Sequence, residues 1–236
     1  MENLEAIVEN ANKSLKFDKI STIGIIGTLI LGCAYPLFFL VSILFIVWKI
    51  YIRKKKVVVL TSSINSEERK LVNDRMTPLK KIANSSKIWE IVQSNAVSNK
   101  KYSAGATSLV KRVTCSSSST LPFPFKSNET PICFKSKNIT LVFLPDILFV
   151  IKGWKIYSVK YSNSTISLSG TSFVESEKVP PDAKIIDKTW KYVNKSGAPD
   201  KRFSDNRQLP VCLYGKLTVQ TKIDNIVLMF SNSDIK

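Results

Sequence analysis

The chain contains no histidine and little glycine, and both shortages narrow the chemistry open to it. Without imidazole there is no Ser-His-Asp or Cys-His nucleophile system, no histidine-ligated zinc and no histidine pH switch. Only 8 of the 236 residues are glycine, which argues against glycine-rich phosphate loops. The four cysteines show no CxxC pair and no metal-ligand spacing. We therefore assign no catalytic residue and expect neither a metal nor a cofactor.

Acidic residues are also scarce, since 18 Asp and Glu face 35 Lys and Arg for a net charge of +17. Residues 1–52 carry four charges of each sign, so the whole excess lies in residues 53–236. The excess begins with a basic run directly after the apolar segment, made of Arg53, Lys54, Lys55 and Lys56. Such a run favours contact with the anionic inner leaflet of a membrane.

Residues 20–48 form a run of 29 residues without a charge. One membrane pass needs about 20 residues and two full passes about 40, so the run predicts a single transmembrane helix over 20–52, kinked near Pro36. The positive-inside rule places the basic end in the cytoplasm and the N-terminus outside. We expect a single-pass protein of the bacterial inner (plasma) membrane with a cytoplasmic C-terminal domain.

Two features near this run suggest further contacts. Residues 1–19 have the apolar spacing of an amphipathic helix. Gly24, Thr28 and Gly32 form a small-xxx-small series on one helix face, which is typical of helix self-association. The sequence therefore allows a homo-oligomer as well as a lipid bilayer as partner.

The remainder divides into a basic juxtamembrane segment with a linker helix, 53–87, and a β-rich domain, 88–236. The linker helix covers 67–82 and is expected to end or bend near Thr77, because Pro78 follows. Short strands are predicted at 88–93, 108–114, 139–144, 147–152, 156–161, 165–169, 184–193, 211–220 and 226–230. This pattern indicates an α+β domain built on an antiparallel sheet or small barrel.

The C-terminal half carries two long motifs, Gly197-Ala-Pro-Asp-Lys-Arg-Phe203 and Asn206-Arg-Gln-Leu-Pro-Val-Cys-Leu-Tyr214. With the preceding Thr189-Trp190 they resemble a bacterial protein family with the pattern TW-x-Y-V-N-K-x-G-G-P-D-R-R-F-x-x-N-R-x-L-P. Further matches of the resemblance, which covers roughly residues 88–231, are Phe143-Leu-Pro-Asp146, Tyr161, Phe173, Glu175, Pro180, Asp182, Ala183, Ala104-Gly-Ala106 and Arg112.

This chain departs from the family pattern at Ala198, where the second glycine stands, and at Lys201, where an arginine stands. The resemblance implies a folded domain and a bacterial source, and the family has no assigned reaction. The Phe143-Leu-Pro-Asp146 strand is also similar to the opening of pleckstrin-homology-like and GRAM-like domains.

The segment 200–207 concentrates three basic residues, two carboxylates and an amide. In a structural interpretation its aspartates cap turns, while Arg202 and Arg207 pair with Asp146, Asp182 or Glu175. In a recognition interpretation the basic groups bind an anion, such as a phosphopeptide, a nucleotide or a lipid head. In a catalytic one the carboxylates bind a divalent ion or act as acid and base. The candidate ligand-binding residues are Asp146, Asp200, Lys201, Arg202, Asn206 and Arg207.

The combined features favour a non-enzymatic, membrane-tethered recognition or assembly module that binds another protein. One alternative is a membrane-bound enzyme or nucleotide-responsive effector that uses Asp146, Asp200, Arg202 and Arg207. A second alternative is a nucleic-acid-binding module held at the membrane, but the basic residues beyond 56 are dispersed and no recognition motif accompanies them.

Overall fold

The computed structural model describes residues 4–60, 68–96, 104, 108–194 and 196–234. The chain divides into two compact units. The first unit comprises Met1–Val72, Ser119–Cys133 and Asn138–Lys160, and the second comprises Asn73–Ser118, Phe134–Lys137 and Tyr161–Lys236.

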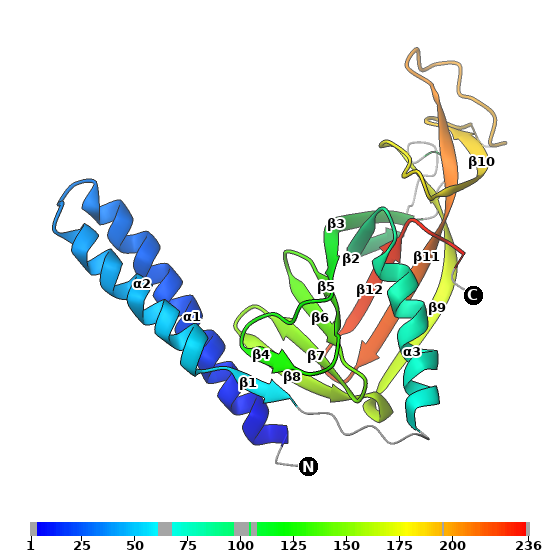
Figure 1. Cartoon of the computed structure of the whole chain (residues 1–236). Coiled ribbons are helices and arrows are strands. Elements are labelled where there is room, and N and C mark those ends of the chain that lie inside the picture. The colour runs from blue at the N-terminus through cyan, green and yellow to red at the C-terminus, as the bar shows by residue number, and fades with distance from the viewer. Residues whose placement is uncertain (1–3, 61–67, 97–103, 105–107, 195, 235–236) are drawn as a thin grey trace. The chain divides into compact units, whose positions relative to one another are not determined.

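The first unit begins with a helical hairpin. Helices α1 (Leu4–Gly32) and α2 (Phe38–Lys55) lie side by side and antiparallel, in the dark and lighter blue of Figure 1. The chain reverses at residues 33–37, where the amides of Cys33 and Ala34 donate to the carbonyls of Ile30 and Leu31. The predicted single transmembrane helix over 20–52 is therefore wrong: its first part continues the 1–19 helix, and its second part returns as α2. No helix among the described residues has both the length and the apolarity to cross a membrane.

The hairpin packs on a small sheet within the same unit. Strands β6 (Ile139–Phe143), β7 (Ile147–Lys152) and β8 (Lys155–Lys160) form an antiparallel meander. Strands β1 (Val58–Leu60) and β4 (Phe125–Ser127) pair in parallel, and neither was predicted. Ala11 and Leu15 of α1 share a core with Phe125 and Phe149, whose rings stack 4.5 Å apart. The N-terminal half of α1 thus packs into the hydrophobic core of the first unit.

The second unit is an antiparallel sheet in the order β10–β11–β12–β2–β3, with β9 on β11. The bounds are β2 Ile88–Ala96, β3 Ser108–Ser118, β9 Ser164–Val174, β10 Lys184–Trp190, β11 Gln208–Thr221 and β12 Asn225–Phe230. The short helix η2 (Tyr161–Asn163) precedes β9, and β5 (Ile132–Lys135), also unpredicted, falls on the division between the units. The long strand β11 is central because it pairs with β9, β10 and β12.

The predicted α+β class with an antiparallel sheet is confirmed. Helix α3 (Glu68–Ala83) continues through Pro78 and does not end near Thr77. The likeness to pleckstrin-homology-like and GRAM-like domains stays a prediction.

Gly215 and Gly170 face each other across β11 and β9, and they offer a matched test of packing. A Cβ on Gly215 would lie 1.8 Å from the buried Phe230 ring, whereas one on Gly170 would make an ordinary 3.4 Å contact with Leu213. We expect Gly215→Ala to cost about 1–3 kcal/mol of unfolding free energy and Gly170→Ala almost nothing. Urea unfolding of both variants measures the difference, and equal midpoints would contradict this packing.

Candidate functional site: the helical hairpin and the polar loop

The hairpin has inverted polarity, with small and polar residues buried between the helices and most of the large apolar residues exposed on the outside. Ser21, Thr28, Gly32 and Ser42 are buried. Ile30 and Leu44 are 67% and 68% exposed. They belong to a larger exposed apolar set that includes Ile23, Ile26, Leu29, Leu31, Tyr35, Leu37, Phe39, Leu40, Val41, Ile43, Ile46 and Val47. We call this set the apolar sleeve. A surface helix of a water-soluble domain has the opposite pattern.

The small residues of α1 accommodate the aromatic rings of α2. A Cβ on Gly24 would lie 2.5 Å from the Phe45 ring, and one on Gly32 would lie 2.8 Å from the Phe39 ring. The small-xxx-small face that suggested self-association is therefore occupied by the chain's own second helix. A homo-oligomer stays a prediction, but it would need another face.

Hydroxyl groups in the helix contact are satisfied without water. Ser42 donates to the Thr28 hydroxyl over 2.7 Å, and Thr28 donates to the carbonyl of Gly24 over 2.7 Å. Such a closed chain of hydrogen bonds is what a polar group needs in an apolar medium.

Charged groups gather at the base of the hairpin. Arg53 donates to both carboxylate oxygens of Asp18, at 2.7 and 3.3 Å, and Lys49 donates to the Thr22 hydroxyl. The predicted membrane-surface residues, Arg53, Lys54, Lys55 and Lys56, occupy the last turn of α2 and its C-cap, and all four are exposed. Cations at a helix C-terminus are favoured by the helix dipole. The structure therefore places these four residues together, immediately after the apolar part of α2.

The close approach of the helices predicts opposite effects for two glycines of α1. Gly24→Ala drives a methyl group into the Phe45 ring, while nothing lies within 4 Å of the corresponding atom on Gly27. Because alanine is the better helix former by about 1 kcal/mol, we expect Gly27→Ala to raise the thermal midpoint and Gly24→Ala to lower it. Circular dichroism melts of the full chain in detergent measure both, and a rise in both would show that the helices do not touch at Gly24.

The predicted polar segment, residues 200–207, forms a loop that is held by its own side chains and by contacts with Tyr192. Arg202 donates to both oxygens of Asp200, at 2.9 and 2.8 Å, and Asp200 is only 4% exposed. The Asn206 side chain accepts from the Tyr192 amide and donates to the Tyr192 and Asp200 carbonyls. Tyr192 and Phe203 stack 4.1 Å apart. Asp200 also accepts from the Arg202 amide, as predicted for a turn-capping aspartate. The predicted pairing of Arg202 with Asp146, Asp182 or Glu175 is wrong, because its partner is the neighbouring Asp200.

The candidate ligand-binding residues are only partly brought together. Asp200, Lys201, Arg202, Asn206 and Arg207 share this loop, and Lys201 and Arg207 are exposed. Asp146 belongs to the β6–β7 turn of the other unit. Just before the loop, Gly197 has φ of +86°, which favours glycine, whereas Ala198 has no such requirement. The departure from the family pattern at Ala198 is therefore tolerated.

Sequence reasoning missed the main polar contact of the second unit. Arg112 lies between the rings of Trp89 and Phe173, 4.4 and 4.7 Å from their centroids. It donates two 2.8 Å hydrogen bonds to Glu175, and the Tyr214 hydroxyl donates a third. Arg112, Phe173 and Glu175 were all matches of the family resemblance, but nothing in the sequence paired them.

Burial acts to raise the pKa of Glu175, but the hydrogen bonds from Arg112, the Glu177 amide and Tyr214 outweigh it and hold this pKa below its ordinary 4.5. Burial, with the hydrogen bond to Glu175, raises the pKa of Tyr214, so its hydroxyl keeps its proton. Burial also raises the pKa of the Cys115 thiol to about 12. An un-ionised thiol of this kind is a poor nucleophile.

The Glu175 pair predicts acid sensitivity. Its contribution is fully present above about pH 4.5 and is lost as the pH falls through the lower folded pKa. We expect Glu175→Gln to lose about 3–5 kcal/mol of unfolding free energy at pH 7, because Arg112 loses its buried partner. On acidification the variant should lose less further stability than the wild type, because it lacks the titrating carboxyl group. Urea unfolding at pH 7 and pH 3.5 measures this. Glu177→Gln, at an exposed side chain, is the control and should resemble the wild type.

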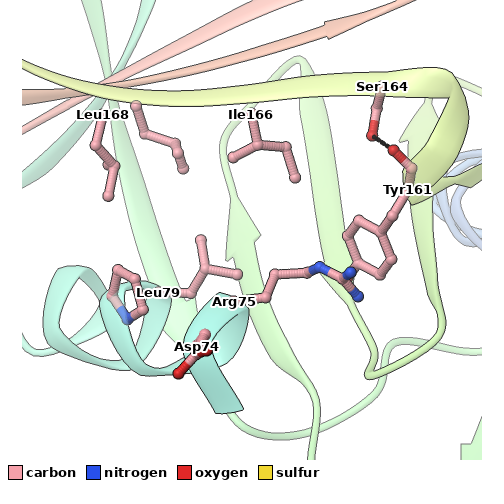
Figure 2. A pocket seen from close by; sticks show the side chains of 9 residues that line it. Asp74, Arg75, Leu79, Tyr161, Ser164, Ile166 and Leu168 are labelled. Carbon is pink, nitrogen blue, oxygen red and sulfur yellow. Dashed lines mark hydrogen bonds between the residues drawn. The ribbon is translucent and has the colours of Figure 1, made fainter. Parts of the chain in front are cut away.

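A groove of about 340 Å³ lies in the second unit between α3 and β9. Figure 2 shows Leu79 directed toward Ile166 and Leu168. The Arg75 guanidinium lies over the Tyr161 ring, 3.8 Å from its centroid. Its walls are mainly aliphatic, and its volume is at the lower limit of ligand pockets, about 300 Å³. Among the described residues no group of three or more acidic or cysteine side chains is placed to hold a metal ion.

Comparison with protein-family models, with curated proteins and with solved structures gives no match. The family resemblance drawn from the motifs therefore stays a prediction, and the hairpin is the strongest guide to function.

Proposed function

We propose that this protein is a membrane-tethered recognition or assembly module that inserts the α1–α2 hairpin into an anionic bilayer from one side, without crossing it. The observation that carries the proposal is the inverted polarity of the hairpin. In water it is unfavourable to expose the apolar sleeve while burying Ser42 and Thr28. In hydrocarbon the same arrangement is favourable, because apolar side chains face the lipid and the hydroxyl groups bond to each other. Each large apolar side chain removed from water contributes about 1.5–3 kcal/mol.

The length of the hairpin fits entry and return on the same side. The uncharged part of α1, residues 20–32, spans about 20 Å at 1.5 Å per residue, against a hydrocarbon core of about 30 Å. An apolar stretch of 10–14 residues is typical of a buried core helix or of a re-entrant segment, and the exposure of the apolar sleeve favours the second. The two helices therefore reach into the membrane and turn there.

Entry and return change the expected orientation. Asn12 of α1 exchanges two hydrogen bonds with the backbone of Ile156 in β8, at 2.7 and 3.0 Å. The start of α1 and the β6–β8 sheet thus lie on one side of any membrane that the hairpin enters, which does not fit an N-terminus outside and a domain inside. We place both in the cytoplasm, against the bacterial inner membrane.

Charge supports an anionic surface as the partner. Lys19, Lys49 and the run 53–56 surround the base of the hairpin, where headgroups would lie. Each basic residue near such a surface contributes about 1 kcal/mol. Trp48 and Tyr51 occupy the same end of α2, which suits interfacial aromatic residues.

The proposal predicts that charge in the apolar sleeve abolishes membrane binding. We expect the double variant Ile30→Asp/Leu44→Asp to lose co-sedimentation with vesicles of phosphatidylcholine and phosphatidylglycerol, because two carboxylates would have to enter hydrocarbon. Ile223→Asp, at an exposed apolar side chain of the β11–β12 turn, is the control and should bind normally.

Salt separates the two contributions to binding. A higher salt concentration should weaken the electrostatic attraction and leave the apolar contribution to binding unchanged.

The charge variants decide whether the hairpin inserts. Equal vesicle binding by Ile30→Asp/Leu44→Asp and the wild type would overturn the proposal.

A further inference from the structure

The turn between β7 and β8 exposes a tryptophan between two lysines. Lys152 of β7 and Lys155 of β8 are opposite each other in the strand register, so the turn has two residues, Gly153 and Trp154. Gly153 has φ of +58°, as the first residue of such a turn requires. Trp154 is 45% exposed, and all four residues lie at the surface. Tryptophan with an exposed ring beside lysines is the residue combination of a membrane–water interface.

Contacts with α1 fix the level of this turn along the hairpin. Asn12 holds Ile156 of β8, and Lys19 donates to the carbonyl of Gly153 at the turn itself. The Lys19 ammonium also lies 5.6 Å from the centroid of the Trp154 ring. Between Asn12 and Lys19 the helix rises about 10 Å toward the tip of the hairpin.

The turn therefore points along α1 toward the apolar sleeve and ends where the sleeve begins. Lys19 is the last charged residue before the uncharged run that starts at Ile20. At the same level Arg53 of α2 pairs with Asp18. Cations from α1, α2 and the turn thus surround one level of the hairpin.

We propose that the β7–β8 turn is a second membrane contact, in which Trp154 enters the interface and Lys152, Lys155 and Lys19 bind phosphates of anionic phospholipids. The inference rests on the proposed insertion of the hairpin. It adds that the first unit rests on the bilayer by its sheet as well as by its helices, which fixes its tilt.

The test compares the full-length wild type with Trp154→Phe on phosphatidylcholine–phosphatidylglycerol vesicles whose acyl chains are brominated near the headgroup. If Trp154 enters the interface, its fluorescence, taken as the difference between the two proteins, shifts to the blue and is quenched on binding. Trp190→Phe, on β10, is the matched control and should leave that quenched component in place. A Trp154 component that is neither shifted nor quenched would overturn the inference.

The lysines are tested separately. Lys152→Gln/Lys155→Gln should weaken binding to anionic vesicles by about fivefold for each lysine and leave binding to pure phosphatidylcholine unchanged. Lys184→Gln/Lys188→Gln removes the same charge from β10, and we expect a smaller loss. Equal losses would show that only total charge matters and would contradict a site at the turn.

The two proposals fail differently. If the wild type sediments with vesicles and Ile30→Asp/Leu44→Asp does not, but Trp154 remains unquenched, the hairpin inserts and the turn does not touch the membrane. If the wild type does not bind vesicles at all, both proposals are wrong.

Discussion

The close contact between α1 and α2 is the constraint on which the N-terminal part of the structure depends. Gly24 and Gly32 let the rings of Phe45 and Phe39 approach the α1 backbone, and only this approach brings Ser42 within 2.7 Å of Thr28. Because the Phe45 and Phe39 rings fill the space beside these glycines, the aliphatic side chains of the two helices point outward. The apolar sleeve is thus a consequence of how the helices pack. A side chain at Gly24 would change the surface as well as the contact.

The second unit depends on a different kind of constraint, a buried ion pair. Two charges taken out of water are expensive unless their hydrogen bonds are complete, and Glu175 meets this condition with Arg112, Tyr214 and the Glu177 amide. The aromatic rings on both sides of Arg112 shield it from water and favour a cation. The contact joins β3 to the end of β9 and to the middle of β11, so it fixes how these strands meet. The ion pair therefore stabilises the arrangement of these strands. It does not line the groove between α3 and β9.

The sequence predicted elements that depend on local signals and missed those that depend on contacts between residues far apart in the chain. Strand β7 was predicted with the bounds it has, 147–152, because a short apolar run bounded by turn residues is a local signal. The short strands β1 and β4 exist only through pairing with each other, and no local signal marks them. The charge-free run 20–48 fits one kinked helix or two short ones equally well in composition. The contact of Gly24 with Phe45, 21 residues later in the chain, decides for two helices. The contact of Arg112 with Glu175, which the sequence also did not predict, joins residues that are still further apart in the chain.

The local and long-range constraints meet at Asn12 and Lys19. The first joins α1 to the backbone of β8, and the second joins it to the turn before β8. If the hairpin inserts as we propose, these two residues transmit its orientation to a folded sheet, because a helix clamped at two levels can neither slide nor rotate against its partner. A single transmembrane helix with a linker would leave its domain free to turn. A hairpin built into the core of its own unit would instead present one defined face to the membrane, which would suit the proposed module if its role is to position a binding surface.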